Sequence, residues 1–182
     1  MIAGSVRGRR LVVPPGTDVR PTQDRVREAM FSALDARGAI ADASVLDLYA
    51  GTGALAIEAL SRGAARAVLV ERSRDAIAAI DTNLEACGFR DRARVEPRAV
   101  EAFLATPARD APFDLVLCDP PYDFPAADLS DVLASIASTH WLAPDAMVVV
   151  ERAQRASVEP PPGLRVMWER AFGDTLVTFL AP

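Results

Sequence analysis

The residues with the clearest chemical use are Asp119, Pro120 and Tyr122, which belong to the tetrapeptide D-P-P-Y. The tetrapeptide follows an apolar run over residues 113–118 that is typical of a buried strand. Prolines fix the backbone and carry no amide hydrogen, so the Asp119 carboxylate and the Pro120 carbonyl can act as paired acceptors. Two acceptors can hold the two hydrogens of an exocyclic amine on a base, and this favours the pyramidal, nucleophilic form of its nitrogen. The ring of Tyr122 offers a face on which that base can stack. The alternative is an ordinary turn that ends a strand.

A second set of candidates surrounds a glycine turn and comprises Asp47, Ala50, Gly51 and Gly53. A carboxylate at Asp47 would repel the pyrophosphate of a dinucleotide but would attract an ammonium group. S-adenosylmethionine carries an ammonium and a sulfonium and no phosphate, so this turn predicts that cofactor. The alternative is that Asp47 only caps the turn or the following helix, although a buried carboxylate is costly without a partner.

Glu71 is the third candidate, because it ends an apolar run over residues 67–71. It stands eighteen residues after Gly53, about where a carboxylate takes the ribose hydroxyls of a bound nucleoside. The alternative is an ordinary acidic residue that begins the next helix.

The elements that would position these residues form an α/β pattern. An apolar strand over residues 45–49, the glycine turn and a helix over 54–60 make the opening unit of a doubly wound sheet. Further strands are expected over residues 67–71, 94–96, 113–118 and 146–151, with an antiparallel pair over 164–168 and 175–180. Helices are expected over residues 22–34, 73–87 and 99–104. The prediction is a doubly wound, mostly parallel, seven-stranded sheet with an antiparallel closing strand.

The N-terminal part of the chain is basic. Residues 1–30 hold six arginines against three acidic residues, which gives this part a net charge of +3. Because the whole chain has a net charge of −5, residues 31–182 have a net charge of −8. Residues 1–20 are expected to form an arm with a short β-hairpin, followed by one domain over 21–182. An acidic body with a basic arm is typical of contact with nucleic acid through one end. The alternative is a solvated arm without a partner. The candidate residues for this contact with nucleic acid are Arg7, Arg9, Arg10, Arg20 and Arg25.

Composition excludes several classes of protein. The chain has 182 residues, two cysteines (Cys87 and Cys118) and one histidine (His140), which is too few for a zinc cluster, a disulfide framework or a Ser-His-Asp site. Cys118 could be read as a nucleophile, but it has no basic partner in sequence, which favours a buried filler. No apolar run reaches membrane-spanning length, and the N-terminus lacks the apolar core of a signal peptide, so a cytoplasmic location is expected.

Taken together, the motifs resemble Rossmann-type methyltransferases that use S-adenosylmethionine. More narrowly, the chain resembles the RsmD family of bacterial 16S ribosomal RNA guanine-N2 methyltransferases. The resemblance runs nearly end to end, through G-x-x-R-G-R-R-L, R-P-T-x-D-R-V-R-E, D-x-x-A-G-T-G, the strand-ending Glu71 and D-P-P-Y. The first two motifs are specific to the family, and the others are shared by amino-methyltransferases generally.

The resemblance implies methyl transfer to the N2 amine of a guanine in 16S ribosomal RNA, free or within a partly assembled small subunit. It implies a monomer that needs no metal. It places Asp47, Ala50, Gly51 and Gly53 at the methionine end of the cofactor and Glu71 at the ribose. It also places Arg98 and Ala99 beside the adenine, although the family more often has Asn or Asp at the position of Arg98.

Three alternative functions stay open at this point. A DNA adenine-N6 methyltransferase shares D-P-P-Y, but this chain has no room for a target-recognition domain. A protein glutamine methyltransferase usually has Asn in place of Asp119. A non-catalytic RNA-binding module would explain the basic arm but not the D-P-P-Y tetrapeptide.

Overall fold

The computed structural model describes residues 1–14, 21–121, 123–138, 140–156 and 159–182. The helices in these ranges are α1 (Pro21–Asp35), α2 (Ala54–Ser61), α3 (Arg74–Cys87), α4 (Val100–Leu104) and α5 (Ala126–Ser138), with short 3-10 turns η1 (Arg90–Arg92) and η2 (Gln154–Ala156). The strands are β1 (Ser44–Leu48), β2 (Arg66–Glu71), β3 (Ala93–Pro97), β4 (Phe113–Cys118), β5 (Leu142–Ala153), β6 (Arg165–Phe172) and β7 (Thr175–Ala181).

The strands described form one seven-stranded sheet in the order β3-β2-β1-β4-β5-β7-β6. The pairs from β3 to β5 are parallel, and β7 runs antiparallel between β5 and β6. Every residue of β1 is buried, as expected for a central strand covered on both faces. The predicted doubly wound sheet with an antiparallel closing strand is therefore confirmed.

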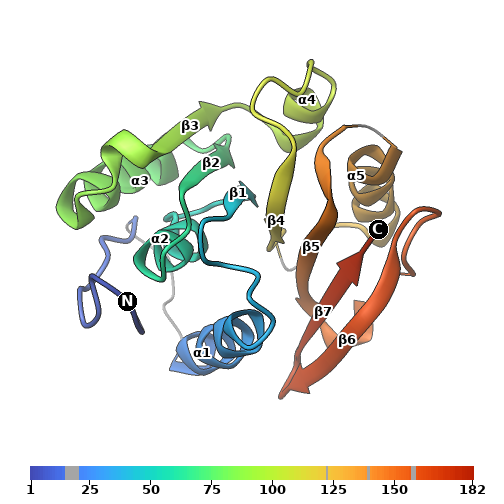
Figure 1. Cartoon of the computed structure of the whole chain (residues 1–182), viewed down its shortest axis with the longest axis horizontal. Helices are drawn as coiled ribbons and strands as arrows, with labels where there is room; N and C mark the ends of the chain where they lie inside the picture. Colours follow the sequence, from blue (N-terminus) through green and yellow to red (C-terminus); the bar gives the residue numbers. More distant parts are fainter. Residues whose placement is uncertain (15–20, 122, 139, 157–158) are drawn as a thin grey trace.

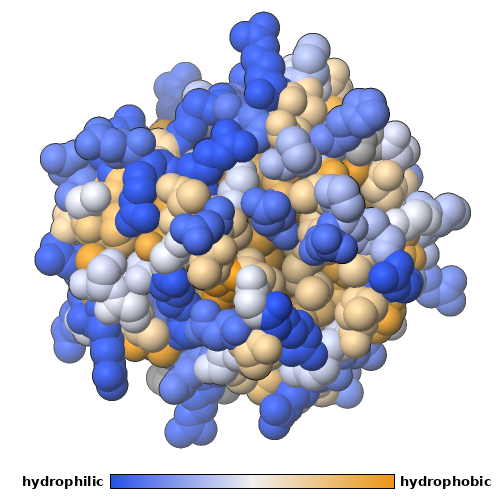
Figure 2. Space-filling model, in the orientation of Figure 1, coloured by the Kyte–Doolittle hydropathy of each residue, from blue (hydrophilic) through white to orange (hydrophobic). Residues whose placement is uncertain are grey.

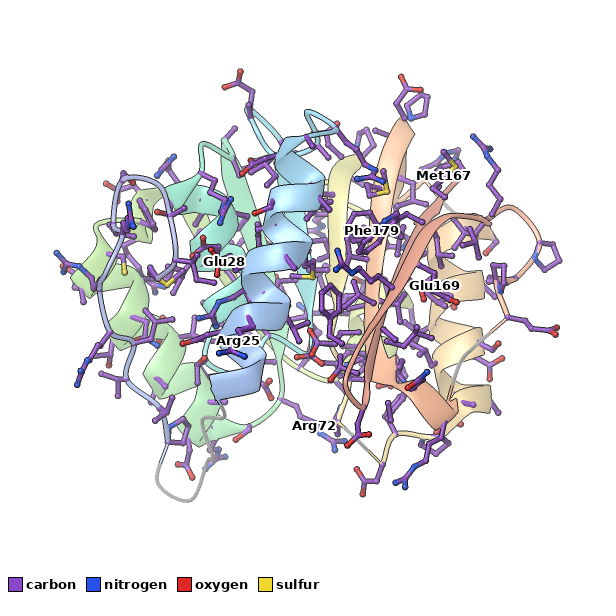
Figure 3. All side chains as sticks on the ribbon, turned by 90° about the horizontal axis from the view of Figure 1, so that it is seen from below. Arg25, Glu28, Arg72, Met167, Glu169 and Phe179 are labelled. Atoms are coloured by element: carbon purple, nitrogen blue, oxygen red, sulfur yellow. The ribbon has the colours of Figure 1, made fainter. Side chains whose placement is uncertain are left out.

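Helices cover both faces of this sheet (Figure 1). On one face α1, α2 and α3 bury a core that includes Phe31, Ile57 and Ile80. On the other face α4 and α5 bury a second core around Phe103 and Trp141, whose ring centroids lie 5.0 Å apart. Figure 3 shows α1 in front of the sheet, with Phe179 of β7 beside it. Because the helices cover the two faces, the carboxyl ends of the strands stay accessible to a ligand.

One helix was missing from the sequence prediction. Helix α5 buries Leu129, Val132, Leu133 and Ile136, which recur at the spacing of one helical face. The predicted bounds of β5 were also too short, because the strand begins at Leu142.

The N-terminal hairpin is not confirmed, because residues 1–14 contain no strand. Their backbone amides bond instead to side chains of α2 and α3. The amide of Ile2 donates to Glu58 Oε2 at 2.8 Å, and the amide of Val12 donates to Asn83 Oδ1 at 2.7 Å. Since the helices satisfy these amides, the segment needs no partner strand and lies beside α2 and α3 (Figure 1). We call residues 1–14 the N-terminal segment.

Polar side chains cover most of the face shown in Figure 2, with small apolar areas between them. None of the described helices is long and apolar enough to cross a membrane.

Candidate active site

Two adjoining hollows lie at the carboxyl ends of β1 and β4. The strand-edge hollow has a volume of about 490 Å³ and is lined by residues that include Glu71, Ala99, Pro120, Phe124 and Arg152. The N-terminal hollow has a volume of about 660 Å³ and lies between the N-terminal segment, the start of α1 and the glycine turn. Their shared wall consists of Tyr49, Gly51, Asp119 and Glu151. The strand order reverses between β1 and β4, which is where doubly wound sheets bind ligands.

The glycine turn after β1 requires unusual backbone angles. Gly51 and Gly53 have φ values of 56° and 77°, and even Tyr49 lies in the left-handed region with a φ of 62°. A Cβ atom on Gly53 would stand 3.1 Å from Leu69 Cδ2. A glycine is therefore needed at position 53 both for its backbone angle and for close packing on β2.

Asp47 is almost completely buried beneath this turn, with 1% of its side chain exposed. Its Oδ2 accepts a hydrogen bond from the Ala56 amide at 3.0 Å, so Asp47 does cap the first turn of α2. Its Oδ1 has no partner among the described residues, and Asp47 lines the N-terminal hollow. Burial raises its pKa to about 8, against the lowering effect of the Ala56 amide, and the charges of Asp119 and Glu71 raise it further. An unpartnered buried acceptor of this kind fits a cationic ligand such as an ammonium group.

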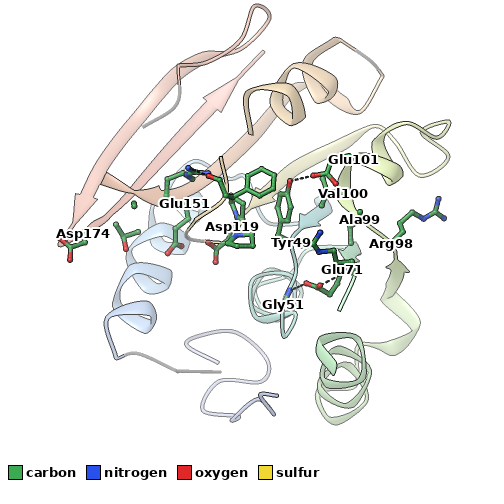
Figure 4. Close-up of a pocket in the computed structure, with 18 residues that line it drawn as sticks. Tyr49, Gly51, Glu71, Arg98, Ala99, Val100, Glu101, Asp119, Glu151 and Asp174 are labelled. Atoms are coloured by element: carbon green, nitrogen blue, oxygen red, sulfur yellow. Dashed lines mark hydrogen bonds between the residues drawn. The ribbon is translucent and has the colours of Figure 1, made fainter. Parts of the chain in front are cut away.

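Glu71 holds the glycine turn against the end of β2. Its Oε2 accepts from the Gly51 amide at 2.9 Å, and its Oε1 accepts from the Arg72 and Ser73 amides at 2.8 Å each. Figure 4 shows the contact between Glu71 and Gly51 at the edge of the strand-edge hollow. A carboxylate has about four acceptor positions, so Oε2 keeps room for a hydroxyl donor.

Asp119 stands directly after β4 and faces both hollows. Its side chain is accessible from the cavity, but the surrounding protein reduces its hydration and raises its pKa to about 6. Pro120 is buried beside it and lines the strand-edge hollow. Two predicted site residues, Tyr122 and Arg20, lie outside the described part of the chain.

Arg98 and Ala99, the two residues predicted to contact adenine, differ in the direction and pairing of their side chains. Ala99 and Val100 line the strand-edge hollow with small apolar side chains. The Arg98 guanidinium points away from the other labelled residues in Figure 4, pairs with Glu96 and lies 5.9 Å from the centre of the Phe103 ring. Arg98, Ala99 and Val100 thus all line the strand-edge hollow, and the guanidinium end of Arg98 is paired with Glu96.

The predicted RNA-contacting arginines fall into two places. Arg7, Arg9 and Arg10 are exposed on the N-terminal segment, and Arg9 and Arg10 line the N-terminal hollow. The Arg9 guanidinium also donates to the Ala86 carbonyl of α3. Arg25 is exposed on α1 (Figure 3). The structure thus brings two of these arginines beside the glycine turn instead of on a projecting hairpin.

Sequence reasoning missed Glu151 on β5. It ends an apolar run, which is the same signal that singled out Glu71. Burial raises the pKa of Glu151 to about 8, the charge of Asp119 raises it further, and Arg27 on α1 lowers it. Tyr49 was also missed as a wall residue. Its hydroxyl donates to Glu101 Oε1 at 3.3 Å, and its ring lies 5.2 Å from that of Phe124.

The cysteine alternative has no support in this geometry. Cys118 is buried, and its pKa is raised first by burial and then by the charges of Asp119 and Asp47. The thiol is therefore protonated at neutral pH and is a poor nucleophile. Within the described ranges, no group of three or more His, Cys, Asp or Glu side chains could hold a metal ion.

A family model described as Conserved hypothetical protein 95 matches residues 1–181. A relative from Escherichia coli strain K12, named Ribosomal RNA small subunit methyltransferase D, is 40% identical over 151 residues, which cover 83% of this chain and 73% of the relative. The chain belongs to this family, the RsmD family of methyltransferases.

Two further comparisons agree with this membership. A Haemophilus influenzae protein of the same name is 32% identical over 175 residues, which cover 95% of this chain and 88% of that protein. The solved structure of the Escherichia coli yhhF protein, described there as a methyltransferase candidate, has a TM-score of 0.86 and 35% identity. It covers 99% of this chain and 95% of that one. The predicted family and the methyltransferase fold are therefore confirmed.

Proposed function

We propose that this protein transfers a methyl group from S-adenosylmethionine to the N2 amine of a guanine in 16S ribosomal RNA. The predicted cofactor is confirmed by membership of this methyltransferase family. The name of the related proteins supports ribosomal RNA as the substrate. The observation that carries the proposal is that Asp119 lies in the wall shared by the two hollows, beside Gly51 of the glycine turn. This arrangement supports a role for Asp119 as an acceptor of amine hydrogens near the glycine turn.

The residues present fit the cofactor. The unpartnered Oδ1 of Asp47 would hold its ammonium group, and the free acceptor position of Glu71 would take a ribose hydroxyl. Ala99 and Val100 would lie against its adenine ring. When bound, S-adenosylmethionine supplies a methyl group on a positively charged sulfur that an amine can attack directly.

Asp119 and Pro120 would act on the substrate amine. The Asp119 carboxylate and the Pro120 carbonyl would hold the two amine hydrogens, which orients the nitrogen lone pair and concentrates it on that atom. With a pKa of about 6, Asp119 is ionised at neutral pH and can also accept the proton that the nitrogen loses. Positioning of the amine beside the methyl group would supply the rest of the catalysis.

Recognition of the RNA would use the exposed arginines. Arg7, Arg9 and Arg10 lie at the N-terminal hollow or beside it, where they would contact phosphates around an unstacked guanine. The predicted monomeric state and cytoplasmic location stay predictions.

The decisive experiment measures transfer of a labelled methyl group to 16S ribosomal RNA, both free and loaded with small-subunit proteins, followed by nucleoside analysis. The expected product is N2-methylguanosine. The comparison of free and loaded RNA identifies the substrate form. DNA and a glutamine-containing peptide serve as competing substrates. Label in N6-methyladenine of DNA or in methylglutamine, with none in the RNA, would overturn the proposal.

A further inference from the structure

Glu151 is a carboxylate of the site to which the proposed methyl transfer gives no role. It lies near the end of β5 and lines both hollows, as Asp119 does. Figure 4 shows the Glu151 and Asp119 side chains extending toward the same side of the strands. No hydrogen bond from the described residues reaches the Glu151 carboxylate, and the charges that act on it are those of Asp119 and Arg27. Glu151 therefore offers a free acceptor beside the amine-binding position.

The next residue along β5 offers a free donor. Arg152 lines the strand-edge hollow and is buried, with 8% of its side chain exposed. Its Nη2 donates to the Phe124 carbonyl at 2.8 Å, whereas its Nη1 is buried without a partner among the described residues. A guanidinium N–H left unpaired in a buried position costs free energy. Nη1 is closed off from the hollow in this structure, so the guanidinium would have to turn toward a ligand oxygen to remove that cost.

The Watson–Crick edge of guanine matches this pair. From the N2 amine, the edge continues with N1–H, which is a donor, and then with O6, which is an acceptor. If Asp119 holds the N2 amine, the neighbouring N1–H needs an acceptor and O6 needs a donor. Adenine presents the opposite pattern at these two positions, with a bare N1 and an amino group.

We propose that Glu151 accepts the N1–H of the target base and that Arg152 donates to its O6, so that the two residues select guanine. This inference rests on the proposed function, because it needs the N2 amine at Asp119. The two residues determine which base is accepted, and the transfer itself is left to Asp119 and Pro120.

The test uses an RNA fragment that carries either guanine or 2-aminopurine at the methylated position. 2-Aminopurine keeps the N2 amine but has a bare N1 and no O6. We expect the wild-type protein to have a higher kcat/KM for guanine than for 2-aminopurine. Glu151→Leu and Arg152→Met should each lower that ratio by about tenfold, mainly through a loss on guanine. Asp174→Asn, which removes a charge elsewhere in the same hollow, should leave the ratio unchanged.

A second variant keeps the test informative if Glu151→Leu fails to fold. Glu151→Gln retains a carbonyl acceptor for guanine, and above about pH 8, where the Glu151 carboxyl of the wild type is ionised, it adds an N–H that can donate to the bare N1 of 2-aminopurine. It should therefore raise kcat/KM for 2-aminopurine, which damage to the fold would not do. A ratio that stays at the wild-type value in all three variants would overturn the inference, as would equal losses on both bases. If the wild-type protein makes no N2-methylguanosine at all, the proposed function fails and this inference falls with it.

Discussion

Replacement of Asp47 by asparagine should stabilise the free protein at neutral and basic pH and weaken cofactor binding. The Asp47 carboxylate is buried with one unpartnered oxygen, and its pKa rises from 3.8 to about 8 on folding. An acid with a raised folded pKa binds a proton more tightly in the folded state than in the unfolded state. Folding is therefore penalised as the pH rises from about 4 to about 8, and the full penalty applies above that range.

The size of the effect follows from these values. About three pH units separate 3.8 from pH 7, and each is worth about 1.4 kcal/mol, so keeping the Asp47 carboxyl protonated in the folded protein costs about 4 kcal/mol at pH 7. The asparagine amide can still accept from the Ala56 amide, but its own N–H group would replace the unpartnered oxygen and would cost about 1–3 kcal/mol. The expected net gain is about 1–3 kcal/mol, which corresponds to roughly 5 °C in Tm for a domain of this size.

The assay is thermal unfolding of the wild-type protein and Asp47→Asn at pH 5 and pH 8, with and without S-adenosylmethionine. The difference in Tm between the two proteins should grow from pH 5 to pH 8, because only the wild type loses a proton at this position. S-adenosylmethionine should raise the Tm of the wild type far more than that of the variant. A variant that is less stable than the wild type at pH 8, or that binds the cofactor equally well, would refute the reasoning.

Three further predictions concern other parts of the site. Asp119→Ala should lower turnover by roughly 100-fold or more while calorimetry shows little change in cofactor affinity, because its hydrogen bonds belong to the transition state; near-normal turnover would contradict its acceptor role. Glu71→Gln should lower the free energy of unfolding in urea by about 1–3 kcal/mol, since an amide cannot accept on both of its ends as Glu71 does, and unchanged stability would be the contrary result. Replacing Arg7, Arg9 and Arg10 with Ala should weaken RNA binding and flatten its salt dependence by about 0.7 to 0.9 log unit per lost phosphate contact; an unchanged slope would remove these arginines from the interface.

Several parts of the fold could be read from short stretches of the sequence. The expected strand over residues 113–118 has the same bounds as β4. The helix expected over residues 73–87 is α3, in which Ser73 caps the start by accepting from the Ala76 amide and Gly88 ends the helix with a φ of 71°. These features depend on neighbours within a few residues, so local composition and periodicity are enough to reveal them. Helix α5 carried the same kind of signal and was overlooked.

The sequence by itself determined the order of strands and helices, the glycine turn and the types of residue that the carboxyl edge presents. Only the tertiary structure decided which groups meet there. Glu58 and Asn83 bind backbone amides of the N-terminal segment that are 56 and 71 residues distant, and residues 1–14 contain no strand. Arg98 pairs with Glu96, and Glu151 comes to lie beside Asp119. Such pairings depend on which partners the sheet topology brings together. Most of these partners are far apart in the sequence, so a local sequence pattern cannot predict which of them will pair.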